Sequence, residues 1–156
     1  MKVKWKKLII CLAIPLAVGA VAALLSGSGM RQYGTLRQPP FSPPGWLFPV
    51  VCTIMNLLMG YASYRVLRSG AEEGQIKKAL SLYGAQLALN FLWPLIFFGL
   101  EMYLLAFIVI LALWVLIFLT INAFSDIDET AGNLLLPYIL WVTFAAYLNV
   151  GVYLLN

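Results

Sequence analysis

The chain has 156 residues, of which 63% are hydrophobic, 14% aromatic and 10% charged, with a formal net charge of +4 and a mean hydropathy of +0.92. Soluble domains carry about 25% charged residues and disordered chains need low hydrophobicity, so both classes are excluded and a small integral membrane protein remains. The absence of histidine also excludes a Ser-His-Asp triad and a histidine-ligated haem or zinc site.

Five apolar runs are each long enough to cross a bilayer as a helix, which requires about 20 residues. Spanning strands would instead show about 10 residues of alternating hydropathy, and helices satisfy their own backbone hydrogen bonds in hydrocarbon. The sequence therefore predicts an all-α membrane protein, a single domain over residues 1–156 built as a bundle of five transmembrane helices. The predicted helices lie at about residues 8–25, 46–67, 79–100, 102–125 and 131–155.

The first run, residues 8–25, has an alternative interpretation. Four lysines precede it and Ala20-Val21-Ala22 lies near its end, a pattern that a cleaved signal peptide also shows. The run is longer than the apolar core of a signal peptide, about 7–15 residues, and this favours a retained helix.

A loop of about 18 residues connects the first two runs and is rich in proline. Its start, Ser26-Gly-Ser-Gly, is typical of a flexible linker, whereas the prolines stiffen its second half. The prolines are Pro39, Pro40, Pro43 and Pro44, and the aromatic residues are Tyr33, Phe41 and Trp46. A loop of this length that is both stiff and aromatic favours a lid over a plain linker.

Two later runs carry amides and aromatics at helical spacing. The spacings of 4, 3 and 4 residues in the run at 79–100 place four side chains on one helix face, and Pro94 behind them predicts a kink. These four are Gln86, Asn90, Trp93 and Phe97, and the run at 131–155 has a similar stripe of Tyr138, Trp141, Ala145, Leu148 and Asn149. Such residues often only join neighbouring helices, but two stripes near a stiff aromatic loop indicate a mostly apolar pocket.

The charged residues lie in the N-terminal tail, in the loops and at the ends of the predicted helices. The cores contain no ionisable residue, which argues against ion-coupled transport. Eight of the ten basic residues lie in the N-terminal tail and the second loop, so the positive-inside rule predicts a cytoplasmic N-terminus and an external C-terminus. The net charge thus reflects topology and anionic lipid contact, and no nucleic-acid partner is expected. The short lysine-rich start is typical of a bacterial cell-membrane protein.

The small residues and the cysteines indicate helix packing. Gly19 with Ala23, and Gly84 with Ala88, predict close helix contacts within the bundle or between subunits. Cys11 and Cys52 lie in apolar runs without metal or redox spacing, so no metal site is expected.

Four segments of the sequence resemble motifs of a known protein family. They are Tyr33-x-x-Leu36-x-x-Pro39, Pro43-Pro44-x-Trp46-x-Phe48-Pro49, Gln86-Leu87-x-Leu89-Asn90-x-x-Trp93 and Leu136-Pro137-Tyr138-x-Leu140-Trp141. In this order and spacing the chain resembles the TspO/MBR family of tryptophan-rich sensory proteins and translocator proteins. The resemblance implies a five-helix bundle, commonly a homodimer, with a pocket under the first loop that binds porphyrins such as protoporphyrin IX.

The resemblance and the stripes together give the candidate ligand-binding residues. The resemblance implies Tyr33, Pro43, Pro44, Trp46, Asn90, Trp93, Trp141, Ala145 and Leu148, to which the stripes add Gln86, Phe97 and Tyr138. A second-helix tryptophan linked in some family members to light-dependent porphyrin degradation falls on Cys52, which argues against an enzyme, although Trp141 is retained. The family's animal sterol motif lacks its basic residue after Tyr153, which argues against sterol binding there.

The sequence therefore favours an integral membrane receptor or carrier, in sensing or transport. Its expected ligands are tetrapyrroles of the protoporphyrin IX type and other flat hydrophobic small molecules, bound in an aromatic pocket inside the bundle. The porphyrin is a ligand and no covalent cofactor is expected. Without a histidine to ligate iron, the metal-free porphyrin is the expected form. Two alternatives stay open: a photo-oxidative, porphyrin-degrading enzyme, and a structural membrane subunit with a vestigial pocket.

Overall fold

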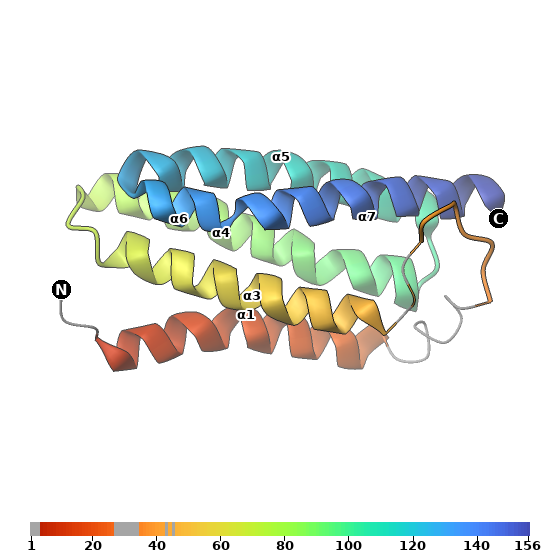
Figure 1. Ribbon diagram of the computed structural model, residues 1–156, viewed down its shortest axis with the longest axis horizontal. Coiled ribbons are helices and arrows are strands. Elements are labelled where there is room, and N and C mark those ends of the chain that lie inside the picture. The colour runs from red at the N-terminus through yellow and green to blue at the C-terminus, as the bar shows by residue number, and fades with distance from the viewer. Residues whose placement is uncertain (1–3, 27–34, 43, 45) are drawn as a thin grey trace.

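A computed structural model of the protein describes residues 4–26, 35–42, 44 and 46–156. These residues form five helical spans that are long and apolar enough to cross a membrane, and they contain no strand. The spans run side by side along the long axis, with the two termini at opposite ends (Figure 1). The predicted five-helix, all-α membrane fold is confirmed.

The spans have the following bounds. The first two are α1 (Trp5–Ser26) and α3 (Leu47–Leu67). The third is α4 (Glu73–Pro94) with its π-helical continuation η1 (Leu95–Gly99), and the fourth is α5 (Tyr103–Ile127). The fifth consists of α6 (Glu129–Leu134) and α7 (Leu136–Leu155). Helix α4 begins well before the predicted residue 79, because a polar stretch with Glu73 in its first turn suits a helix N-terminus.

Proline interrupts the third and fifth spans. At Pro94 the helix changes from α to π geometry, so the backbone amide of Leu100 donates to the carbonyl of Leu95 at 2.8 Å. The predicted disruption there takes the form of a π-helical turn, which is a common form at such sites. The fifth run, predicted as one helix, is interrupted at Leu135, because Pro137 in the next turn has no amide hydrogen to donate.

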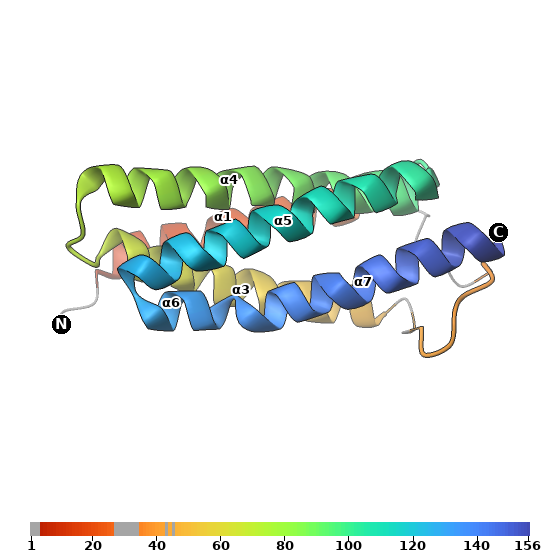
Figure 2. The same ribbon diagram turned by 90° about the horizontal axis from the view of Figure 1, so that it is seen from above.

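The helices pack in a closed ring. Helix α1 packs mainly against α3, with further contacts to α4 and η1. Helix α4 packs along α5, which packs against α6 and α7, and α6 closes the ring against α3. Figure 2 shows α7 and α3 on one side and α4 on the other. A ring of five helices leaves room between α1, α3, α4 and α7 for an internal cavity.

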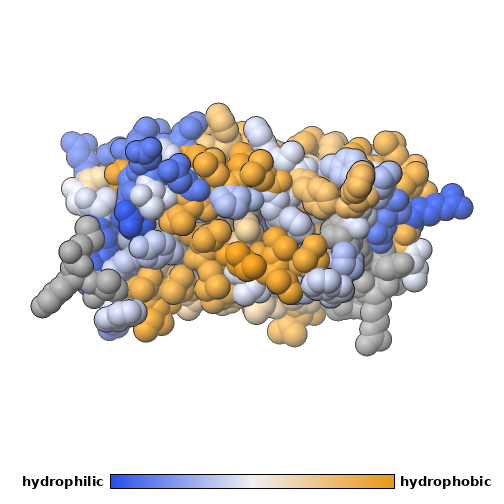
Figure 3. Space-filling model, in the orientation of Figure 1, coloured by the Kyte–Doolittle hydropathy of each residue, from blue (hydrophilic) through white to orange (hydrophobic). Residues whose placement is uncertain are grey.

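The two ends of the bundle differ in charge. The N-terminus of α1, the C-terminus of α3 and the N-terminus of α4 lie at one end of the bundle (Figure 1). The described members of the basic set predicted to share a side therefore do lie at the same end. At this end Arg65 forms an ion pair with Asp128 at 2.9 Å. Hydrophobic residues cover the middle of the visible face and hydrophilic ones gather toward its ends (Figure 3). This distribution fits an integral membrane protein.

Candidate functional site

A cavity of about 440 Å³ lies in the half of the bundle nearest the long loop. This volume is within the range of small-molecule sites, about 300–1,000 Å³. All five spans contribute, and the described residues that line it include no charged side chain. The lining comprises Leu16, Gly19, Ala20, Ala22, Ala23, Ser26, Phe48, Pro49, Cys52, Thr53, Met55, Asn90, Trp93, Pro94, Phe98, Ile110, Leu113, Tyr138, Trp141, Val142 and Ala145.

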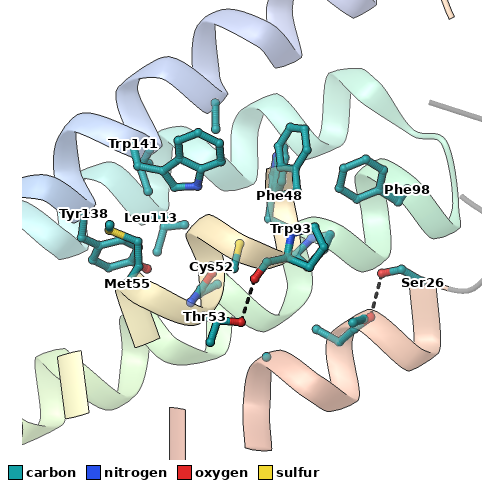
Figure 4. A pocket seen from close by; sticks show the side chains of 18 of the residues that line it. Ser26, Phe48, Cys52, Thr53, Met55, Trp93, Phe98, Leu113, Tyr138 and Trp141 are labelled. Carbon is teal, nitrogen blue, oxygen red and sulfur yellow. Dashed lines mark hydrogen bonds between the residues drawn. The ribbon is translucent and has the colours of Figure 1, made fainter. Parts of the chain in front are cut away.

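Aromatic rings form a continuous part of the cavity wall. Phe48 of α3 meets Phe98 of η1 edge-to-face at 5.4 Å and Trp141 of α7 at 5.5 Å. Trp93 of α4 meets Phe98 at 5.8 Å. These side chains surround the same space, with the sulfur of Cys52 between them (Figure 4). The wall therefore offers large apolar ring faces and edges to a ligand.

Trp93 is held in place by a buried amide. Its indole Nε1 donates to Oδ1 of Asn149 at 2.9 Å, and Nδ2 of Asn149 donates to the backbone carbonyl of Tyr103 at 2.8 Å. Asn149 is completely buried. The indole also stacks on Phe97 at 4.9 Å, with an interplanar angle of 23°. Asn149 and Phe97 thus fix the orientation of a cavity residue from behind.

Gln86 fixes the orientation of Tyr138 in the same way. The Tyr138 hydroxyl donates to Oε1 of Gln86 at 2.7 Å, and Nε2 of Gln86 lies 3.5 Å from the sulfur of Met59. Gln86 is buried and does not line the cavity. Its amide therefore joins α4 to α7, the cross-helix role that amides commonly have in membranes.

The described part of the long loop lies along α7. The Tyr147 hydroxyl donates to the carbonyl of Pro40 at 2.7 Å. Pro39 is buried against Gly151, where any added Cβ would overlap the proline ring. The backbone of Arg37 and the side chain of Asn156 exchange two hydrogen bonds. None of the described loop residues lines the cavity, and residues 27–34, 43 and 45 of the predicted lid lie outside the described residues.

The two loop aromatics that the structure describes, Phe41 and Trp46, are exposed. Residues 39–42 form a turn in which the amide and hydroxyl of Ser42 both donate to the carbonyl of Pro39. Phe41 adopts a φ of 66° in this turn and is 91% exposed. Trp46, predicted to line the pocket, is 67% exposed. Pro44 is exposed too, and Tyr33 and Pro43 lie outside the described residues.

The structure brings five of the predicted residues together at the cavity. These are Asn90, Trp93, Tyr138, Trp141 and Ala145. Gln86 and Phe97 support them from behind, and Leu148 is buried in the core without reaching the cavity. The sequence did not indicate the contribution of α1, whose small residues are typical of packing contacts, or that of Phe48, which lies within the second of the four family-like segments.

The fold and the cavity define a class: a polytopic α-helical membrane protein with an aromatic small-molecule cavity inside the bundle. Residues 11–155 match the sequence model of the TspO/MBR family. The chain belongs to this family, which confirms the resemblance seen in its motifs.

Three relatives illustrate the match. The tryptophan-rich protein TspO of Chlorobaculum tepidum is 38% identical over 150 residues, covering 96% of this chain and 95% of the relative. Protein CrtK of Rhodobacter capsulatus is 36% identical over 138 residues, covering 88% and 85%. The translocator protein of Homo sapiens is 36% identical over 124 residues, covering 79% and 73%.

Proposed function

We propose that this protein is a membrane receptor or carrier that binds a tetrapyrrole of the protoporphyrin IX type in the cavity, for sensing or transport. The observation that supports it most is the 440 Å³ cavity walled by Phe48, Trp93, Phe98 and Trp141. Relatives whose names include a tryptophan-rich sensory protein and a translocator protein agree with either role.

The chemistry of the lining favours a flat, largely apolar ligand. Indole and phenyl rings stack on or contact the edge of a macrocycle, each contributing about 0.5–1.5 kcal/mol beyond area burial. Asn90 adds one amide that can donate and accept. The hydroxyls of Ser26 and Thr53 both donate to carbonyls of their own helices, so toward a ligand they act as acceptors. Such acceptors suit the pyrrole N–H groups of a metal-free porphyrin.

A porphyrin titration tests this proposal. Protoporphyrin IX is added to protein in nanodiscs and binding is followed by the porphyrin's own absorbance, which does not depend on the number of tryptophans. We expect Trp141→Phe to weaken binding about 2- to 10-fold, because it removes one indole contact. Trp114→Phe is the matched control, since Trp114 lies on α5 and outside the cavity. Equal affinity of the two variants and the unmodified protein would refute the stacking role.

The same samples separate binding from degradation. Under illumination we expect the absorbance of the bound porphyrin to decay no faster than that of porphyrin in empty nanodiscs. The cavity has Cys52 beside Trp141 rather than a second indole at that position (Figure 4). Faster decay that Trp141→Phe abolishes would favour the degrading enzyme instead.

We also propose that the protein lies in a bacterial cell membrane with the N-terminus in the cytoplasm. All described basic residues except Arg37 lie at the N-terminal end of the bundle, where the positive-inside rule places the cytoplasm. Single cysteines at Lys6 and at Arg37, labelled with an impermeant maleimide in intact cells, test this: only the Arg37→Cys chain should react. The homodimer stays a prediction that molecular mass in nanodiscs can check.

A further inference from the structure

The cavity wall is unevenly exposed. Four of its lining residues are exposed, Ala20 and Ala23 on α1 and Pro49 and Thr53 on α3. Each pair is spaced three or four residues apart, so each occupies one edge of its helix. The exposed part of the wall is therefore the seam between α1 and α3.

The other half of this seam is tightly closed. A Cβ at Gly60 of α3 would lie 2.6 Å from the carbonyl oxygen of Cys11 and 2.8 Å from Cα of Leu12. A Cβ at Gly19 of α1 would lie 2.5 Å from Nδ2 of Asn56. Helix α1 is thus in close contact with α3 from Cys11 to Gly19, against the backbone of Gly60 at one point and the side chain of Asn56 at the other, and the two glycines permit this approach.

Beyond Gly19, toward the loop, exposed residues of the cavity wall line the seam between α1 and α3. The exposed lining residues there are two alanines on α1 and a proline and a threonine on α3, all of them small. Thr53 lies on the side of α3 that faces α1, and Cys52 lies deeper in the cavity (Figure 4). These four residues therefore belong both to the cavity wall and to the outer surface of the bundle.

The outside of this opening faces hydrocarbon. Helix α1 is a candidate membrane span whose large exposed side chains are apolar, among them Ile14, Val21 and Leu24. No charged residue lies in α1 after Lys7. A membrane-embedded helix with such a surface contacts acyl chains, so water does not occupy the mouth.

We propose that the cavity exchanges its ligand sideways with the bilayer, through a portal bounded by Ala20, Ala23, Pro49 and Thr53. The ligand then belongs to the class of flat, apolar molecules dissolved in the membrane. The ligand's identity as a tetrapyrrole rests on the proposed function, whereas the portal rests on geometry alone. The described loop residues, bonded along α7, are not part of this route.

A cysteine in the cavity allows the portal to be tested without porphyrin. Cys11 and Cys52 are the two cysteines of the chain, so Cys11→Ala leaves Cys52 as a single reporter on the cavity wall. In lipid vesicles, pyrene maleimide partitions into the bilayer, and the thiol adds its S–H across the maleimide double bond. The rate of adduct formation then measures passage from the membrane to the cavity.

Narrowing the portal should slow this reaction. We expect Ala23→Phe to lower the labelling rate at least about 10-fold, because a phenyl ring fills a gap bounded by small side chains. Ala17→Phe is the matched control, because Ala17 is exposed on the same helix and does not line the cavity. Thr53→Phe narrows the portal from the opposite wall if the α1 variant fails to fold. Labelling of both narrowed variants at the Ala17→Phe rate would overturn the proposal.

Porphyrin kinetics separate this proposal from the proposed function. With the portal present, Ala23→Phe should slow both association and dissociation of protoporphyrin in vesicles. If the unmodified protein binds no porphyrin but Cys52 labelling still depends on Ala23, the portal stands and the tetrapyrrole assignment fails. If porphyrin binds and the labelling is independent of Ala23 and Thr53, the portal fails and the tetrapyrrole assignment stands.

Discussion

Replacing Asn149 with leucine tests whether the wall of the cavity is held from behind. Asn149 is fully buried and bonds both the Trp93 indole and the Tyr103 carbonyl. Leucine has the same branched shape and number of heavy atoms but a larger volume, so the substitution removes the two hydrogen bonds and leaves no empty space. Trp93 then loses the partner that orients it, and the indole N–H is left buried without an acceptor.

The expected cost follows from the two bonds. A buried hydrogen bond contributes about 0.5–1.5 kcal/mol net in soluble proteins, and within membranes the average is about 0.6 kcal/mol. Asn149→Leu should therefore reduce the free energy of unfolding by about 1–2 kcal/mol. In a Trp93→Phe background the indole bond is already absent, and only the bond to Tyr103 remains to be lost. The coupling energy between the two substitutions is then about 0.6–1 kcal/mol.

A double-mutant cycle measures this coupling. Unfolding of the four chains, the unmodified protein, two single variants and the double variant, is followed by circular dichroism in mixed detergent micelles. Independent sites add to within about 0.3–0.5 kcal/mol, so a coupling energy below that range would refute the view that Asn149 acts through Trp93. A porphyrin affinity unchanged in Asn149→Leu would show that the orientation of Trp93 does not affect binding.

Two further predictions concern the framework. Gly60→Val should lower the free energy of unfolding by more than about 2 kcal/mol, because the new side chain meets the backbone at Cys11. Gly84→Ala should be neutral or stabilising, because a Cβ there meets nothing within 4 Å. Thermal unfolding measures both variants. At the charged end, partial burial raises the pKa of Asp128, but the hydrogen bonds and charge of Arg65 outweigh it and hold that pKa below its ordinary value. The ion pair therefore stabilises the protein above about pH 4, the unfolded value, and the contribution is lost as the pH falls through the lower folded pKa. Asp128→Asn should remove this acid dependence, at a cost of at most about 1 kcal/mol at neutral pH.

The five spans could be predicted because hydrocarbon imposes a simple rule on composition and length. The interruption at Leu135 was harder to predict, since a membrane helix can continue through a proline when its neighbours satisfy the freed backbone groups. The start of α4 was equally hard to predict. Glu73 and the polar residues after it are too hydrophilic to belong to an apolar run, yet they form the first turns of this helix.

The candidate site was predictable only in part, for a physical reason. Helical spacing places Gln86, Asn90 and Trp93 on one broad face, but the two edges of that face have different neighbours. Packing directs Gln86 to Tyr138 and leaves Asn90 at the cavity. The periodicity of one helix cannot decide this, because the answer depends on how the neighbouring helix is rotated.

The contacts between the loop and the last helix have a mechanical consequence. Helix α7 carries Trp141 and Ala145 on the cavity wall, and farther along it holds the loop through Tyr147 and Gly151. A helix is stiff along its axis, and close-packed contacts transmit displacement rather than absorb it. Helix α7 therefore couples the cavity wall mechanically to the outer surface of the bundle. The exposed Phe41 lies at the outer end of this connection, in the turn that α7 holds.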